Sequence, residues 1–106
     1  MIRAPSFTGG PSIEYVCPAG KIAVVKSLTI VWGNVTISGV DAWFQFQDLT
    51  KLARYTWFTS MSAFTNNGGT AQWWGSWALD PGETISVQTA AGTVDFQASG
   101  YELTLP

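Results

Sequence analysis

The sequence predicts an all-β protein, a single jelly-roll-like antiparallel β-sandwich of about seven to eight strands. Short segments rich in Val, Ile, Thr, Trp, Phe and Tyr recur along the 106-residue chain, and clusters of Gly, Pro, Asn and Asp separate them. Several segments alternate apolar and polar residues, and none shows the period of about 3.6 residues that marks an amphipathic helix. A chain of this length has room for one domain and one core.

Turn-forming residues divide the main body of the domain into its expected strands. The ranges of these strands are 12–16, 21–32, 40–48, 51–61, 70–79, 84–90 and 93–105. The clearest turn signal is Asp80-Pro81-Gly82-Glu83, because proline presets φ at the second turn position and glycine accepts a positive φ at the third. We therefore expect a tight turn between strands 70–79 and 84–90.

Alternation assigns a face to most side chains of the middle strands. In strand 40–48, Phe44 and Phe46 point toward the core, while Trp43, Gln45 and Gln47 point outward. In strand 70–79, the inward residues by the same rule are Trp73, Gly75, Trp77 and Leu79, and the outward residues are Gln72, Trp74 and Ser76.

Two expected strands break this alternation. In strand 21–32, Ile22 and Val24 share a face with the later apolar residues only if Lys26 also points inward. In strand 93–105, the apolar residues before and after Ser99-Gly100 are out of step. We expect a bulge there, or a bend that carries one strand across two sheets.

The beginning of the chain differs in composition from the rest. Residues 1–11 contain two prolines and two glycines, and we expect an extended N-terminal arm that precedes a sandwich domain of residues 12–106. The side chains through which this arm makes contact are Ile2, Arg3 and Phe7. They pack either on their own domain or on a neighbouring subunit.

Composition excludes several classes of partner. Charged residues make up 11% of the chain, the net charge is −2, and the five basic residues are scattered, so we expect no nucleic-acid partner. No segment approaches the roughly 18 consecutive apolar residues of a membrane helix, so we expect no membrane partner. Residues 1–11 lack the apolar run of a signal peptide. Cys17 is the only cysteine, so no intrachain disulfide forms.

The residues needed for common enzyme chemistry are missing. The chain has no histidine, which removes the usual general base and the commonest metal ligand. Zinc would need several cysteines, and the chain has one. Asp48, Asp80 and Glu83 fall in turns, where acidic side chains bond to the backbone. We expect no catalytic residue, no metal, no cofactor and no enzyme activity.

The aromatic residues exceed what one small core readily hides, since the chain has 6 Trp, 6 Phe and 3 Tyr. Trp43 and Trp74 are assigned to outward faces, and we take them, with Gln45, Gln47 and Gln72, as the candidate interface or ligand-binding residues. Three interpretations are open. In the first, the fold itself covers these side chains, or the strand register differs by one residue. In the second, they form a subunit interface. In the third, the Trp rings stack on a sugar while the Gln amides bind its hydroxyls.

Four segments of the sequence, taken in order, carry a resemblance to a known family. The segments are Cys17–Lys21, Ala23–Ile30, Trp77–Ile85 and Ala98–Leu103. In this order they resemble small β-sandwich virion proteins of tailed bacteriophages, and the resemblance covers most of residues 15–105. It implies a capsid-decoration or head/tail accessory protein that forms a symmetric homo-oligomer and contacts other virion proteins, such as the major capsid protein. It brings no catalytic residue, and the Trp content departs from the family pattern.

We therefore expect a structural virion protein, made in the host cytoplasm and located on the particle. The alternative is a carbohydrate-binding β-sandwich module that uses Trp43 or Trp74 to bind a glycan. A third hypothesis is a domain of a larger secreted enzyme, and the initial Met1 and the final strand argue against it.

Overall fold

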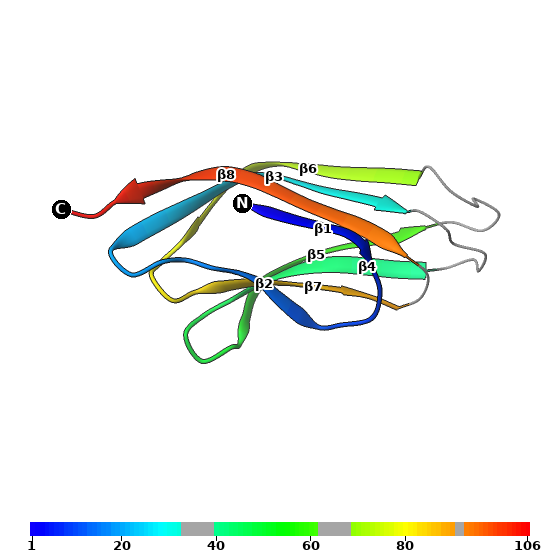
Figure 1. Cartoon of the computed structure of the whole chain (residues 1–106), viewed down its shortest axis with the longest axis horizontal. Coiled ribbons are helices and arrows are strands. Elements are labelled where there is room, and N and C mark those ends of the chain that lie inside the picture. The colour runs from blue at the N-terminus through cyan, green and yellow to red at the C-terminus, as the bar shows by residue number, and fades with distance from the viewer. Residues whose placement is uncertain (33–39, 62–68, 91–92) are drawn as a thin grey trace.

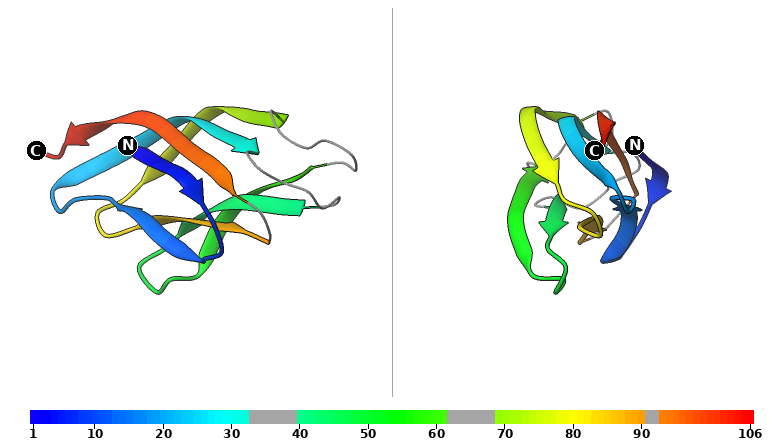
Figure 2. Two further views of the ribbon diagram at one scale, coloured as in Figure 1. Left: turned by 45° about the vertical axis from the view of Figure 1, so that its right-hand side comes forward. Right: turned by 90° about the vertical axis from the view of Figure 1, so that its left-hand side faces the viewer.

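The structure is a computed structural model, and it describes residues 1–32, 40–61, 69–90 and 93–106. In this part of the chain every regular element is a β-strand, and two four-stranded antiparallel sheets pack face to face (Figures 1 and 2). Sheet A has the strand order β1-β8-β3-β6, and sheet B has the order β2-β7-β4-β5. The strands are β1 (Ile2–Phe7), β2 (Ser12–Val16), β3 (Lys21–Trp32), β4 (Val40–Gln47), β5 (Ala53–Met61), β6 (Gly69–Leu79), β7 (Thr84–Thr89) and β8 (Val94–Thr104).

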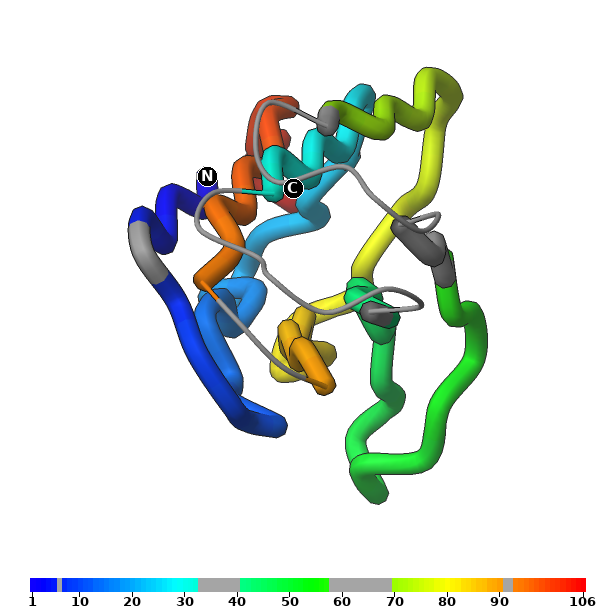
Figure 3. Tube along the Cα trace, turned by 90° about the vertical axis from the view of Figure 1, so that its right-hand side faces the viewer, coloured from blue at the N-terminus to red at the C-terminus, as the bar shows by residue number. Residues whose placement is uncertain are grey.

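The chain changes sheet between most consecutive strands. Among the described strands, β4 and β5 are the one pair adjacent in both sequence and sheet, and the other consecutive strands lie in different sheets. Figure 3 looks along the strands and shows the resulting two layers. Eight strands connected in this order form a jelly roll, so the predicted fold class is confirmed.

Phenylalanine side chains fill the space between the two sheets. Phe44, Phe46 and Phe96 are fully buried. Phe44 of sheet B meets Phe96 of sheet A edge to face with ring centroids 5.3 Å apart, and Phe7 packs on the same Phe96 ring at 5.5 Å. Such edge-to-face pairs are the favoured aromatic geometry in a core. The inward assignment of Phe44 and Phe46 is confirmed.

A row of aromatic rings closes the side of the sandwich where β5 lies over β6. The Tyr55 ring of β5 stacks on Trp77 of β6 with centroids 4.9 Å apart, and Phe46 stacks on both. Trp73 lies beside Tyr55 at 6.2 Å. Tyr55, Trp73 and Trp77 are half-buried and pack against the core, so part of the aromatic surplus serves the fold.

The break in alternation in β3 is a bulge at Lys26. The register with both neighbouring strands shifts between Val25 and Ser27, and the Lys26 side chain is exposed. Val25 is buried before the bulge and Leu28 after it. Ile22 and Val24 were expected to share a face with the later apolar residues of this strand only if Lys26 pointed inward. Because Lys26 points outward, they do not.

The break in β8 lies opposite the same bulge. Gly100 pairs with Val25, and Ser99 pairs with Ser27. Strand β8 then continues beside β3 as far as the pair Lys21 and Thr104, so it stays in sheet A throughout. Strand β8 pairs with β3 without an extra residue of its own, so neither a bulge nor a bend lies in β8; Tyr101 and Leu103 fall out of step with Phe96 because they lie on the outer face of sheet A.

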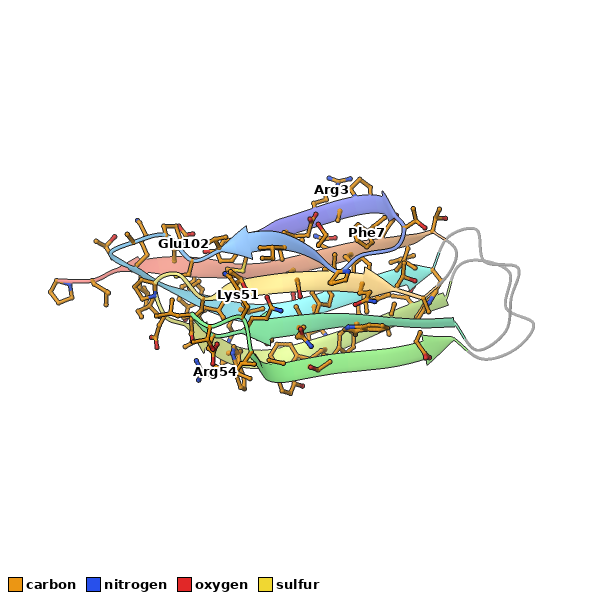
Figure 4. The ribbon with its side chains drawn as sticks, turned by 90° about the horizontal axis from the view of Figure 1, so that it is seen from below. Arg3, Phe7, Lys51, Arg54 and Glu102 are labelled. Carbon is orange, nitrogen blue, oxygen red and sulfur yellow. The ribbon has the colours of Figure 1, made fainter. Side chains whose placement is uncertain are left out.

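The first residues are a strand of the sandwich. Strand β1 pairs with β8 through Ile2 opposite Ala98 and Arg3 opposite Gln97. Ile2 is buried, Phe7 packs on the chain's own core, and Arg3 points away from the sandwich (Figure 4). The structure therefore has no boundary at residue 12. Proline inside this segment is tolerated because β1 is an edge strand.

Candidate functional site

The predicted candidate residues lie on two opposite outer faces of the sandwich. Trp43, Gln45 and Gln47 belong to β4 and face outward from sheet B. Gln72 and Trp74 belong to β6 and face outward from sheet A. The structure therefore does not bring the two tryptophans into one platform, and each face has to be considered separately.

The outer face of sheet B carries a hydrogen-bonded row of side chains. The Thr84 hydroxyl donates to Gln47 Oε1 over 3.0 Å, and Gln47 Nε2 donates to Gln45 Oε1 over 3.0 Å. Trp43 continues the row along β4 and lies opposite Gln88 of β7. These bonds fix the orientation of the amides beside a half-buried indole. Amides held in this way can donate to and accept from hydroxyl groups.

The outer face of sheet A carries the most exposed large apolar side chain among the described residues. The exposed fraction of Trp74 is 72%, and its cross-strand partner is Ser27 of β3. Gln72 is also exposed and lies opposite Thr29. The outward assignment of Trp74 agrees with this position. Within the described part of the fold, no other side chain covers the Trp74 ring enough to bury it.

Beyond the bulge, the same face of sheet A becomes apolar. Val24 lies opposite Tyr101 of β8 and opposite Ala78 of β6, and Ile22 lies opposite Leu103. Tyr101 and Leu103 are 50% and 53% exposed. We call these five residues the apolar band. Sequence reasoning did not name them as a site, although Tyr101 and Leu103 gave a signal by falling out of step with Phe96.

A hydrogen bond joins the two sheets beside this band. The Tyr15 hydroxyl of β2 donates to the Glu102 carboxylate of β8. Burial of the phenol raises the pKa of Tyr15 well above its usual value, and the hydrogen bond to Glu102 raises it further. A hollow of about 220 Å³ lies here, lined by Met1, Tyr15, Gly100, Tyr101 and Glu102.

The ionic contacts at the β5 edge hold turns together. Arg54 Nη1 lies 2.7 Å from Glu83, and the Glu83 carboxylate also accepts the Asp80 N–H over 2.8 Å. The hydrogen bond and charge of Glu83 raise the pKa of Arg54, whose guanidinium lies 5.8 Å from the centre of the Trp77 ring. Arg54 points outward from this edge in Figure 4. Glu83 thus bonds to the backbone of its turn, as expected.

In the described ranges, Asp48 and Cys17 face polar groups of the chain itself. The Asp48 carboxylate accepts hydrogen bonds from the hydroxyl and N–H of Thr50 and from the N–H of Leu52, which together lower its pKa. The Cys17 thiol is buried, which raises its pKa, and it faces the Leu79 carbonyl. No group of three or more His, Cys, Asp or Glu residues there could hold a metal ion. No helix of the described chain is long and apolar enough to span a membrane.

Comparison with known proteins adds no relative. No protein-family model, no curated protein and no solved structure matches this chain. A jelly roll supports many unrelated functions, so the fold alone assigns none. The function must be argued from the two outer faces.

Proposed function

We propose that this chain is a structural protein of a tailed-bacteriophage particle, either a capsid-decoration protein or a head/tail accessory protein. It acts through contacts with copies of itself and with other virion proteins such as the major capsid protein, and it needs no cofactor. It is made in the host cytoplasm and resides on the virion. The proposal rests on surface chemistry together with the sequence resemblance to small virion β-sandwich proteins.

The apolar band is the observation that carries the proposal. Neighbouring strands place Val24, Ala78 and Tyr101 in one row, with Ile22 and Leu103 in the next row of β3 and β8. A contiguous apolar surface exposed to water is costly unless a partner covers it, and such patches mark contact sites. Protein interfaces are also depleted in charge at their centre and enriched in aromatic side chains. The band meets both conditions.

The described surface favours a flat macromolecular contact over a small-molecule pocket. Two hollows found among the described residues measure about 120 and 220 Å³. Pockets for small ligands typically enclose roughly 300–1,000 Å³. A low content of charged side chains, 11% of the chain, also allows copies to pack side by side without strong repulsion.

The first test asks whether the protein is part of the particle. Particles from the phage that encodes the chain are purified on a density gradient and analysed by mass spectrometry and by immunogold electron microscopy. The proposal predicts the protein in a fixed ratio to the major capsid protein, with gold at a defined place on the virion. Absence from purified particles would contradict it.

A second test asks whether the apolar band makes the contact. Replacing Tyr101 and Leu103 together by Ser is expected to weaken binding to particles that lack the protein by about tenfold or more, because central aromatic and aliphatic contacts dominate interfaces. The matched control replaces Ile13 and Val16, which are similarly exposed on β2 of sheet B, by Ser. Equal binding by the two double variants would show that the band is not the contact surface.

One observation favours a second candidate function, carbohydrate binding on sheet B. The ordered amides of Gln45 and Gln47 lie beside Trp43, and this combination of stacking ring and hydrogen-bonding groups suits a sugar. Glycan-array binding that is lost on Trp43→Ala and kept on Trp74→Ala would support this site. Loss on Trp74→Ala alone would instead place the glycan on sheet A.

A further inference from the structure

We propose that the free edge of β6 is the seam of a two-fold dimer, in which β6 pairs antiparallel with β6 of a second copy. The inference rests on the proposed function, because both require assembly, and it goes further by naming the strand through which two copies meet. Sheet A of each copy would then join into one continuous sheet.

The four edge strands of the sandwich differ in how they are protected against pairing. Charge, proline, short length and bulges are the common protective devices of edge strands. Strand β1 carries Arg3 and Pro5, β2 has five residues with Glu14 at a register shift, and β5 carries Arg54. Strand β6 has 11 residues with no charge and no proline. Of the four edge strands, β6 is the one that is long and has neither charge nor proline, and its one protective feature is a bulge after Trp74.

A bulge limits the part of β6 that can pair. The register with β3 shifts between Trp74 and Trp77, where a Cβ on Gly75 would lie 2.7 Å from the Trp73 ring. Before this point, the pairing runs without a break from Gly69 to Trp74. We place the seam on this straight segment, whose length matches the average β-strand of about five to six residues.

The exposed side chains of this segment suit a copy of the same strand. A two-fold axis normal to the sheet makes the two strands antiparallel, so a residue on the axis meets its own copy. A charge at the axis would face a like charge, and the segment has no charge. Lys26 of β3 reaches β6 at the bulge, where its Nζ donates to Ser76, and Arg54 of β5 is paired with Glu83. Trp74, 72% exposed, supplies the apolar surface that pairing would cover.

A pairing centred on Gln72 gives a definite geometry. Directly opposed residues in antiparallel strands have Cβ atoms about 4.5–5.5 Å apart. The two Gln72 side chains would then face one another across the axis on the outer side of sheet A. The isosteric substitution Gln72→Glu places a carboxylate on each of these two facing side chains.

The test compares Gln72→Glu with Gln97→Glu. Gln97 is exposed on the same face of sheet A, but it lies in β8, between β1 and β3 and away from the free edge. Sedimentation equilibrium measures the dimer dissociation constant of each protein, and circular dichroism checks the fold. We expect Gln72→Glu to weaken the dimer by about tenfold or more at low salt, with partial recovery at high salt because of screening. Gln97→Glu should behave as the unchanged protein.

Hydrogen exchange gives an independent readout of the seam. Amides in the peptide that covers Gly69–Trp74 should exchange more slowly as protein concentration rises through the dissociation constant, and this effect should vanish in Gln72→Glu. A chain that stays monomeric at millimolar concentration overturns the inference. A dimer that both Glu variants leave unchanged, or that gives no protection at β6, overturns it as well.

The outcome separates this inference from the proposed function. A protein found on particles but without a β6 dimer keeps its proposed function and loses the seam. A β6 dimer formed by a protein absent from particles keeps the seam and loses the virion role.

Discussion

Gly100 lies where β8 passes close to the backbone of β3 at the bulge, and we expect Gly100→Ala to be strongly destabilising. A Cβ added at this position would lie 2.0 Å from the Val24 carbonyl oxygen and 3.0 Å from the Val25 Cα. Both contacts are with backbone atoms, so no side-chain rotation relieves them. The two strands must move apart instead.

The size of the effect follows from this separation. Close carbon–oxygen contacts in sheets are about 3.3–3.6 Å, so the added Cβ and the Val24 oxygen at 2.0 Å must separate by roughly 1.3 Å or more. Hydrogen bonds weaken steeply when they stretch by this amount, and each contributes about 1 kcal/mol. Loss of about two ladder bonds and looser packing beneath them lowers the free energy of unfolding by roughly 2–4 kcal/mol. This is a large part of the roughly 5–15 kcal/mol typical of a domain.

Urea unfolding followed by tryptophan fluorescence measures this loss. The control is Gly20→Ala, because Gly20 has a φ of 75° but no atom within 4 Å of its added Cβ. The control is expected to lose about 1 kcal/mol from backbone strain alone. If Gly100→Ala loses no more than Gly20→Ala, the close approach of β3 and β8 is not rigid and the reasoning fails.

Two further substitutions probe the core and the bond between the sheets. Phe96→Ala removes the ring that packs on both Phe7 and Phe44. In the same assay it should lower the free energy of unfolding by about 3–5 kcal/mol. A loss below about 1 kcal/mol would contradict the packing described. Tyr15→Phe removes the hydrogen bond to Glu102. Burial of the phenol and this hydrogen bond both raise the pKa of Tyr15, so the bond of the neutral hydroxyl stabilises the fold below the unfolded-state pKa of about 10 and is lost as pH rises through the higher folded-state pKa. The stability difference between the unchanged protein and Tyr15→Phe should therefore narrow between about pH 10 and pH 12, and a constant difference would show that the bond does not titrate.

Much of the fold could be predicted because its signals are local. Alternation placed Phe44 and Phe46 inside, and the broken alternation around Lys26 fell where β3 has its bulge. Strand β1 was not predicted, because Pro5 inside it and the glycines after it gave the composition of an arm. What makes β1 a strand is its pairing with β8, which lies at the other end of the sequence. Such long-range pairing leaves no local signal.

The candidate site was harder to predict, because strand order decides which residues share a face. Alternation identified Trp43 and Trp74 as outward-facing, but it contains no information on the sheet to which each strand belongs. The structure places β4 in sheet B and β6 in sheet A, so the two indoles lie on opposite sides of the molecule. The outward position of Tyr101 follows from alternation along β8, but its place beside Val24 depends on the bulge at Lys26 in another strand.

The opposite placement of the two faces makes assembly and glycan binding compatible. A seam along β6 extends sheet A and leaves the Trp43, Gln45 and Gln47 face of sheet B open in both copies. Two such faces on one dimer would bind a glycan-covered surface bivalently, and linked sites can exceed the affinity of one site by a factor of about 10²–10⁴ without new contacts. If sheet B binds glycan, Gln72→Glu should then weaken attachment to a glycan-coated surface while leaving the affinity for the free sugar unchanged. A parallel loss of both would mean that the substitution acts on the sugar site itself, and the two faces would not be independent.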